Sequence, residues 1–235
     1  MRSGRKLSAL GVAAGVLTIV GPLLAYFRVG RPILGFVFFA VGGIVSVLLG
    51  VAAIVRLVRG RGLTVGSATS LVVGTIFVGL IVSGSDHPRI NDFTTNPADP
   101  PTLQFAATLP ENRGRDLSYP PAFAAIQQQC CGDLQSVQLP LAPAEALERA
   151  RRLAEAQPSW RVTHTDAAAG TVEAVATSRL FHFQDDVVIR VRAGGAGASV
   201  IDMRSKSRDG QGDFGVNAAR IRNFMVAIRT AEGGR

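Results

Sequence analysis

The first third of the chain contains three long apolar runs that no acidic, basic or histidine residue interrupts. The runs cover residues 7–27, 32–55 and 63–82. A helix needs about 20 apolar residues to cross the hydrocarbon core of a bilayer. Because each run has this length, the sequence predicts a membrane region over residues 1–84 with three transmembrane helices. The chain is therefore expected to be an integral membrane protein that contacts the lipid bilayer.

A cleaved signal peptide is the alternative interpretation of the first run, since basic residues precede it. The run exceeds the roughly 7–15 residues that form the apolar part of a signal peptide. No clear A-x-A cleavage site follows it, and two further apolar runs come after it. We therefore expect the first helix to be retained.

Small residues recur at a spacing of four in all three runs. This spacing places them on one face of a helix, where the backbones of neighbouring helices can approach closely. The three helices are therefore expected to pack together. Because no ionisable residue lies inside the runs, neither a transporter nor a pump is expected. The small residues are Gly11, Gly15, Gly42, Ser46, Gly50, Gly66, Ser70 and Gly74.

The net charge of +8 comes from the membrane region. Residues 1–85 hold eight of the 25 basic residues and none of the 17 acidic ones, so the remainder is formally neutral. A nucleic-acid-binding domain needs an excess of positive charge on the folded domain itself, so nucleic acid is not expected as a partner. The scarcity of lysine and the abundance of alanine and glycine are typical of a GC-rich bacterial genome.

The basic residues also predict an orientation in the membrane. Loops that are richer in lysine and arginine generally stay in the cytoplasm. This rule places the N-terminus inside and the C-terminal domain outside, in the periplasm or its equivalent, for a multi-pass protein of the cell (inner) membrane. The richer side carries Arg2, Arg5, Lys6, Arg56, Arg59 and Arg61, and the other side carries Arg28, Arg31 and Arg89.

Residues 85–119 are predicted to form an extended, proline-rich linker. Proline lacks an amide donor and interrupts both helices and sheet ladders. The remaining residues, 120–235, are numerous enough to form one compact soluble domain with its own core. The linker prolines are Pro88, Pro97, Pro100, Pro101 and Pro110.

The soluble domain is predicted to be an α+β fold in which helices cover one face of an antiparallel sheet, in the order β-α-β-β-β-β-α. Apolar residues follow helical spacing in two segments and alternate in the others. Asp213 is placed to cap the second helix. Strands are expected at 134–139, 160–165, 171–178, 187–192 and 199–207, and helices at 144–157 and 214–229.

Two stretches carry a resemblance to a known family. The first is HPRINDFTTNPADPP at residues 87–101, and the second runs from TSRLFHFQDD at 177–186 to SKSRDGQGDFGVNAARIR at 205–222. Over residues 87–225 the chain resembles the bacterial and plastid family called domain of unknown function 1499. The resemblance implies a membrane-associated, extracytoplasmic domain without an established activity. His182 and the pair Cys130 and Cys131 depart from the family pattern.

The polar residues of the second stretch are candidates for an anion or ligand site. Free amide groups at a helix start, with arginines near by, suit a carboxylate or an anionic headgroup. In the structural alternative, Asp213 only caps the helix, and Asp185 or Asp186 pairs with Arg208 or Arg220 and locks the sheet to the helix. The candidate residues are Asp185, Asp186, Ser207, Arg208, Asp213, Asn217 and Arg220.

Two other chemistries remain open at this stage. An envelope hydrolase could use Asp185, Asp186 and His182, since catalytic groups are recognised by geometry rather than by order. No G-x-S-x-G, H-E-x-x-H or phosphate-loop motif supports it. Cys130 and Cys131 could handle a soft metal through their thiols, but no C-x-x-C or Cys/His cluster indicates zinc. No resident metal or cofactor is expected.

The sequence therefore favours a non-enzymatic, membrane-anchored extracytoplasmic module. Its neutral domain is expected to bind a partner protein, an anionic lipid or another envelope component. The oligomeric state does not follow from the sequence.

Overall fold

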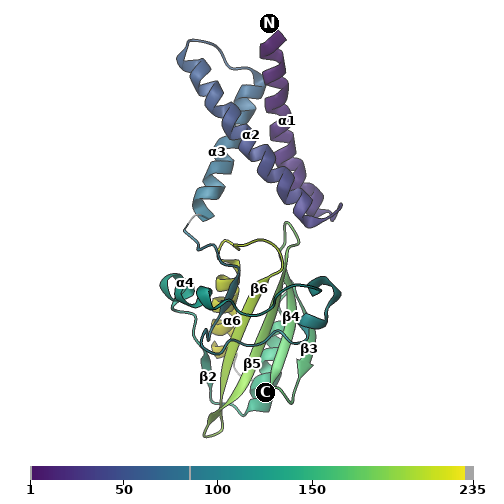
Figure 1. The fold of residues 1–235 in the computed structure, drawn as a ribbon, viewed down its shortest axis with the longest axis vertical. Helices are drawn as coiled ribbons and strands as arrows, with labels where there is room; N and C mark the ends of the chain where they lie inside the picture. The colour runs from purple at the N-terminus through teal and green to yellow at the C-terminus, as the bar shows by residue number, and fades with distance from the viewer. Residues whose placement is uncertain (1, 85, 231–235) are drawn as a thin grey trace. The chain divides into compact units, whose positions relative to one another are not determined.

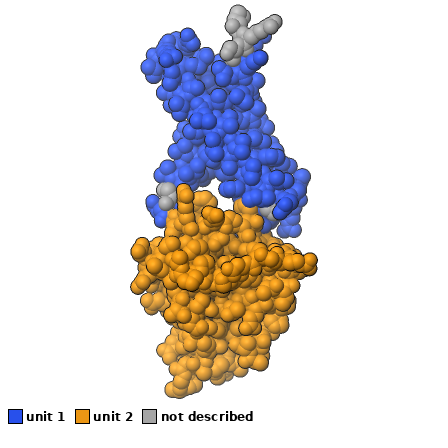
Figure 2. Space-filling view, in the orientation of Figure 1, with its two compact units in different colours: residues 1–86, 178–182 blue, residues 87–177, 183–235 orange. Residues whose placement is uncertain are grey.

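The computed structural model describes residues 2–84 and 86–230. The chain forms two compact units, which Figure 2 shows in different colours. Unit 1 consists of Met1–Asp86 and Ser178–His182, and unit 2 consists of His87–Thr177 and Phe183–Arg235. Positions 1, 85 and 231–235 of the predicted ranges lie outside the described residues.

Unit 1 contains three helices, each long and apolar enough to cross a membrane (Figure 1). They confirm the three long apolar helices that the sequence predicted. Pro32 lies in the first turn of α2, where its missing amide costs no helical hydrogen bond. Gly30 and Gly60 have φ angles of 80° and 71°, which permit the turns on either side of α2. The helices are α1 (Arg2–Tyr26), α2 (Pro32–Val58) and α3 (Val65–Gly84).

Small residues lie where the backbones of the three helices meet. A Cβ atom added to Gly66 in α3 would lie 1.9 Å from the carbonyl oxygen of Ser8 in α1. A Cβ atom added to Gly42 in α2 would lie 2.5 Å from the hydroxyl oxygen of Thr18 in α1. Ser70 in α3 is fully buried. The bundle therefore uses the predicted small residues as its contact surfaces.

Replacing Gly66 by alanine is expected to loosen this bundle. The added methyl group would overlap the backbone of α1, and overpacking of this kind costs about 1–3 kcal/mol. Gly79, in the same helix, has no atom within 4 Å of its Cβ position, so Gly79→Ala is the matched control. We expect a lower midpoint temperature for Gly66→Ala alone when the loss of folded protein in mild detergent is followed by size-exclusion chromatography. Equal midpoints would contradict the close contact.

Unit 2 contains an antiparallel sheet in the order β1-β6-β5-β4-β3. β2 also pairs with β6, so β1 and β2 follow each other along the same edge of β6. The strands are β1 (Asp92–Thr94), β2 (Val137–Leu139), β3 (Trp160–Asp166), β4 (Thr171–Thr177), β5 (Gln184–Gly195) and β6 (Ala198–Ser207).

Helices cover one face of this sheet. The order β2-α5-β3-β4-β5-β6-α6 confirms the predicted α+β fold. The ring of Trp160 stacks on Phe224 of α6, with 5.5 Å between centroids. The main core also includes Val187, Ile189, Ile201, Met203, Ile221 and Ile228. The helices are α4 (Pro121–Cys131), which the sequence did not predict, α5 (Pro143–Glu155) and α6 (Val216–Thr230).

The other face of the sheet is covered by residues 95–119, which we call the strap (Figure 1). Leu103 and Ala106 of the strap are buried against Val188 of β5. The sequence predicted an extended linker here. The prolines do keep the strap out of the sheet ladders, but they do not prevent its apolar side chains from packing on the sheet. Its two 3-10 helices are η1 (Ala106–Thr108) and η2 (Pro110–Asn112).

Glu173 of β4 holds the strap through two backbone amides. Its carboxylate accepts hydrogen bonds from Phe105 N at 2.7 Å and from Ala106 N at 2.8 Å. Burial raises the pKa of Glu173, and the amide donors offset this only in part. The folded domain therefore holds this proton more tightly than the unfolded chain does. Its stability falls as the pH rises from the ordinary glutamate pKa, about 4.3, through the folded value.

Replacing Glu173 by glutamine is expected to remove this pH dependence. The amide group of glutamine cannot accept the second N–H, so the free energy of unfolding at pH 7 should fall by about 1–3 kcal/mol. Urea unfolding of the full-length protein at pH 4.5 and pH 7 would measure both effects. If wild type and variant lost the same stability between these pH values, the role assigned to Glu173 would be wrong.

Candidate functional site

The seven predicted site residues lie near one end of the sheet, where β5 begins and β6 ends. Asp185 of β5 is paired with Ser207 of β6. The residues do not form a single cluster, because successive residues of a strand point to opposite faces. Asp185 faces α6 and Asp186 faces the strap. The structure therefore divides the predicted site into a helix-side group and a strap-side group.

The helix-side group connects α6 to the sheet. Arg220 Nη2 lies 2.5 Å from a carboxylate oxygen of Asp185. The fully buried Asn217 accepts a hydrogen bond from Ser205 Oγ at 2.6 Å and donates one to Ser207 Oγ at 2.8 Å. Arg220 also donates to Asn217 Oδ1. These contacts fix the first turns of α6 against β5 and β6.

Asp213 caps α6, as the sequence predicted. Its carboxylate accepts hydrogen bonds from Gly215 N at 2.9 Å and Asn217 N at 2.7 Å. Burial raises the pKa of Asp213, and these two amides act against the increase. The amide groups that an external anion would bind at this helix start are thus already used by a side chain of the protein.

The strap-side group is centred on Asp186, whose side chain is fully buried. Arg208 Nη2 lies 2.6 Å from one carboxylate oxygen. Arg115 and Asn112 of the strap donate to the other oxygen at 3.3 Å and 3.0 Å. Arg208 also donates to Gln184 Oε1 at 2.7 Å. Asp186 therefore joins the strap to β5 and to the segment that follows β6.

A third group, built on Asp92 of β1, was not predicted from the sequence. Arg204 donates to both carboxylate oxygens of Asp92, at 2.9 and 2.7 Å, and Lys206 Nζ lies 3.0 Å away. The Arg204 guanidinium also lies 5.6 Å from the centroid of the Tyr119 ring. Charged residues at every second position of β6 are the signal that could have revealed this group, since they mark one face of a strand.

A fourth buried carboxylate repeats this arrangement. Arg190 Nη2 lies 2.7 Å from Asp202 and Arg192 Nε lies 2.8 Å from it. Burial acts to raise the pKa of Asp202, but bonds from Arg192, Ser136 and Arg190 outweigh it and keep this pKa below its ordinary value. Asp92, Asp186 and Asp202 thus each bind two basic side chains, an arrangement that stabilises the carboxylate form and positions the chain around it.

The geometry does not support the hydrolase hypothesis. That hypothesis needs Asp185, Asp186 and His182 around one cleft, but the two aspartates face opposite sides of the sheet and both bind arginine. His182 lies in the β4–β5 turn with a φ angle of 54°. Among the described residues, no group of three His, Cys, Asp or Glu side chains is arranged to hold a metal ion.

Cys130 and Cys131 lie at the C-terminal end of α4. Their sulfur atoms are in contact, with Cys130 exposed and Cys131 buried. Burial and the neighbouring Cys130 raise the pKa of Cys131 to about 12. Because the thiolate is the form that binds metals and attacks disulfides, Cys131 is poorly reactive at neutral pH.

Unit 2 also has an open groove beside the N-terminal half of α5. Its volume is about 530 Å³. The lining is largely apolar, and its one arginine, Arg151, is paired with Glu148 at 2.7 Å and Glu155 at 2.5 Å. The lining residues are Pro143, Ala144, Leu147, Glu148, Arg151, Thr165, Ala167, Gly170 and Val191.

The comparisons with known proteins agree with the resemblance seen in the sequence. Neither the curated proteins nor the solved structures gave a match. The family described as "Protein of unknown function (DUF1499)" matches residues 92–228. This range begins at β1 and ends within α6, so it includes the strap, the whole sheet and all four buried aspartate groups. The match covers more than half of the chain, and the protein therefore belongs to the DUF1499 family.

Proposed function

We propose that this protein is a membrane-anchored module whose soluble domain lies outside the cytoplasm and binds a partner without catalysing a reaction. One observation carries the proposal. The carboxylates that would serve as catalytic acids or bases are already held, Asp185 by Arg220 and Asp186 by Arg208 and Arg115. An acid that is fixed in an ion pair is poorly suited to exchange protons during a reaction.

The groove beside α5 supports a protein partner over an anionic lipid or another charged envelope component. Its lining is largely apolar, and Arg151 is neutralised by two glutamates. Apolar concave surfaces with a few polar groups are typical of binding sites. The anion site predicted at the start of α6 is less favoured, because Asp213 and Asp185 occupy its amides and its arginine.

Native mass spectrometry of the full-length protein, extracted from its own membranes in mild detergent, tests this proposal. The wild type is expected to retain a partner. Ala144→Trp, which fills the groove, should lose it, whereas Glu145→Trp, the next residue of α5 and not part of the lining, should keep it. Equal retention by the two variants would exclude the groove. The non-catalytic role would be excluded if the protein turned over an envelope substrate and if Asp185→Asn abolished this turnover without lowering the melting temperature.

The proposed orientation has its own test. Alkaline phosphatase folds into an active enzyme only when it is exported, so a fusion after Arg235 is expected to be active. A fusion to a reporter that works in the cytoplasm should be inactive at the same position. The reverse pattern would place the soluble domain in the cytoplasm.

A second candidate function is thiol-based metal handling at Cys130 and Cys131, favoured by the contact between their two sulfur atoms. Two adjacent thiols could together bind a soft metal ion such as Hg²⁺ or Cd²⁺. Titration of the metal into wild type and into the double Cys130→Ser, Cys131→Ser variant would decide this. Tighter binding by wild type supports the function, and equal binding rejects it.

A further inference from the structure

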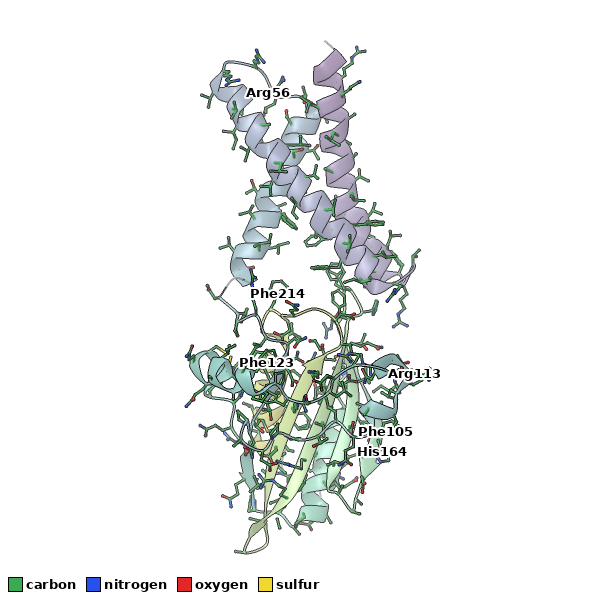
Figure 3. The ribbon with its side chains drawn as sticks, in the orientation of Figure 1. Arg56, Phe105, Arg113, Phe123, His164 and Phe214 are labelled. Atoms are coloured by element: carbon green, nitrogen blue, oxygen red, sulfur yellow. The ribbon has the colours of Figure 1, made fainter. Side chains whose placement is uncertain are left out.

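Phe214 is exposed in a backbone conformation that bulky residues avoid. It lies in the segment between β6 and α6, where its side chain is 62% exposed and its φ angle is 53°. Val216, two residues later, is 47% exposed. A positive φ angle at an aromatic residue is a genuine outlier, and such strain is concentrated at functional positions. Figure 3 labels Phe214 beyond the end of the sheet at which β6 finishes.

The residues that follow α3 hold this segment in place. The ring of His87 lies against Gly215, so that a Cβ atom there would be 2.5 Å from His87 Nδ1. Gly215 itself has a φ angle of 78°, which glycine adopts without strain. Asn91 Nδ2 donates a hydrogen bond to the carbonyl oxygen of Gly210 at 2.6 Å. Together with the Asp213 cap, these contacts fix the backbone on both sides of Phe214.

The length of the chain then limits how far Phe214 can be from the membrane. α3 ends at Gly84, and His87 follows three residues later. Three residues span at most about 11 Å, even when fully extended. The polar layer on each side of the hydrocarbon core is about 5–8 Å thick. Because Phe214 adjoins the glycine that His87 contacts, Phe214 stays close to this limit whatever the tilt of the rest of the domain.

The exposed charges in these two segments have no positive excess. Asp86 and Asp209 are acidic, Arg89 is basic, and Arg208 is already bound to Asp186. A surface of this kind has no net attraction for anionic headgroups, so apolar contact has to provide the affinity. Aromatic side chains are enriched at the interface between lipid and water, where they anchor proteins.

We propose that Phe214, with Val216 beside it, inserts into the interfacial layer of the lipid bilayer as a second membrane contact of the soluble domain. The contact is additional to the covalent link through α3. It would restrict the rotation of the domain on its short tether and hold one end of the sheet at the membrane surface. The proposal does not depend on the identity of any partner that binds the groove.

The test places a single tryptophan at position 214. Phe214→Trp is made in a Trp160→Phe background, which removes the protein's one natural tryptophan and keeps a ring against Phe224. The matched control is Ala196→Trp in the same background. Ala196 is exposed, has a φ angle of 47° and lies in the β5–β6 turn. That turn is at the opposite end of the ten-residue β6, about 30 Å away.

Both proteins are reconstituted at full length into nanodiscs with phosphatidylcholine that carries bromine on its acyl chains near the headgroup. Bromine quenches tryptophan only on close contact. Fluorescence at position 214 is expected to fall at least twofold relative to non-brominated lipid and to be shifted to the blue. Fluorescence at position 196 should be unchanged. An unquenched tryptophan at position 214 overturns the proposal. This holds both when its emission is that of a solvent-exposed ring and when its emission is that of a ring buried against another protein.

A second measurement covers the case in which the tryptophan variants are poorly folded. The photoreactive residue p-benzoylphenylalanine is introduced at position 214 of the otherwise unchanged protein, and a second sample carries it at position 196. Irradiation in nanodiscs should add the mass of one lipid only in the first sample. Equal lipid adducts at both positions, or none at 214, would contradict the proposed contact.

Discussion

Replacing Asp92 by asparagine is expected to lower the free energy of unfolding of the soluble domain by about 3–5 kcal/mol, because it leaves buried cations without their carboxylate. Arg204 is 2% exposed and Lys206 is 7% exposed, and both contact Asp92. Urea unfolding in mild detergent would measure this through Trp160, the chain's one tryptophan. With a dependence of about 1–3 kcal/mol per molar urea, the midpoint should fall by about 2 M.

Asp133→Asn is the matched control for this prediction. Asp133 forms an ion pair with Arg222 at 2.5 Å, but both side chains are about half exposed. Exposed ion pairs contribute about 0–1 kcal/mol, since water already solvates both charges. The control should therefore unfold close to the wild-type midpoint. Similar midpoints for the two variants would show that the Asp92 group carries little of the stability of the domain.

Replacing Arg220 by methionine is expected to be nearly as damaging. The variant removes the cation that lies 2.5 Å from Asp185, a residue with 5% exposure, and leaves that carboxylate buried without it. It also removes the donor to Ser205 Oγ at 2.9 Å. Loss of one partner from a buried pair costs about 3–5 kcal/mol. Urea unfolding followed through Trp160 is again the measurement.

Arg222→Met is the matched control for Arg220→Met, because it also removes an arginine from α6, two positions further along the helix. Its partner Asp133 is exposed, so the change should cost less than about 1 kcal/mol. The comparison also tests the predicted anion site, to which Arg220 belongs. If Arg220→Met left stability unchanged but abolished the binding of an anionic ligand, Arg220 would be a binding residue and the structural interpretation would be wrong.

The elements that the sequence predicted are those in which apolar residues recur at the regular spacing of a helix or a strand. The apolar stripe of α5 and the alternation along β5 and β6 each repeat over several residues. Their observed ranges differ from the predicted ones by only a few residues. The membrane helices were predicted for the same reason, because an uninterrupted apolar run of this length has few other stable structures in water or lipid.

The elements that were missed depend on distant partners. β1 has only three residues and lies between prolines, so its pairing with β6 is decided by tertiary contacts. The strap packs through a few apolar residues that follow no repeating pattern. α4 carries alanine and glutamine in place of a continuous apolar stripe. No local signal in these segments distinguishes a packed structure from a linker.

The candidate site was predicted in part. The structural alternative predicted that one of the two aspartates pairs with Arg208 or Arg220, and the structure shows that both aspartates are paired, Asp186 with Arg208 and Asp185 with Arg220. This alternative could not assign Asp185 to the helix side of the sheet and Asp186 to the strap side, because the direction in which each residue of β5 points was not known. The contact between Asp92 and Arg204 joins residues 112 positions apart, which no spacing rule reaches.

The pairing of β1 with β6 also has a consequence for the synthesis of the chain. Residues 92–119 are made early, but the strands that they cover come much later, and β6 ends at Ser207. Until β6 has left the ribosome, the strap has no complete surface to bind. The buried aspartates would meanwhile remain solvated and apart from their arginines. Folding of this domain is therefore expected to be completed only after nearly all of its residues have been made, when its two ends close on each other.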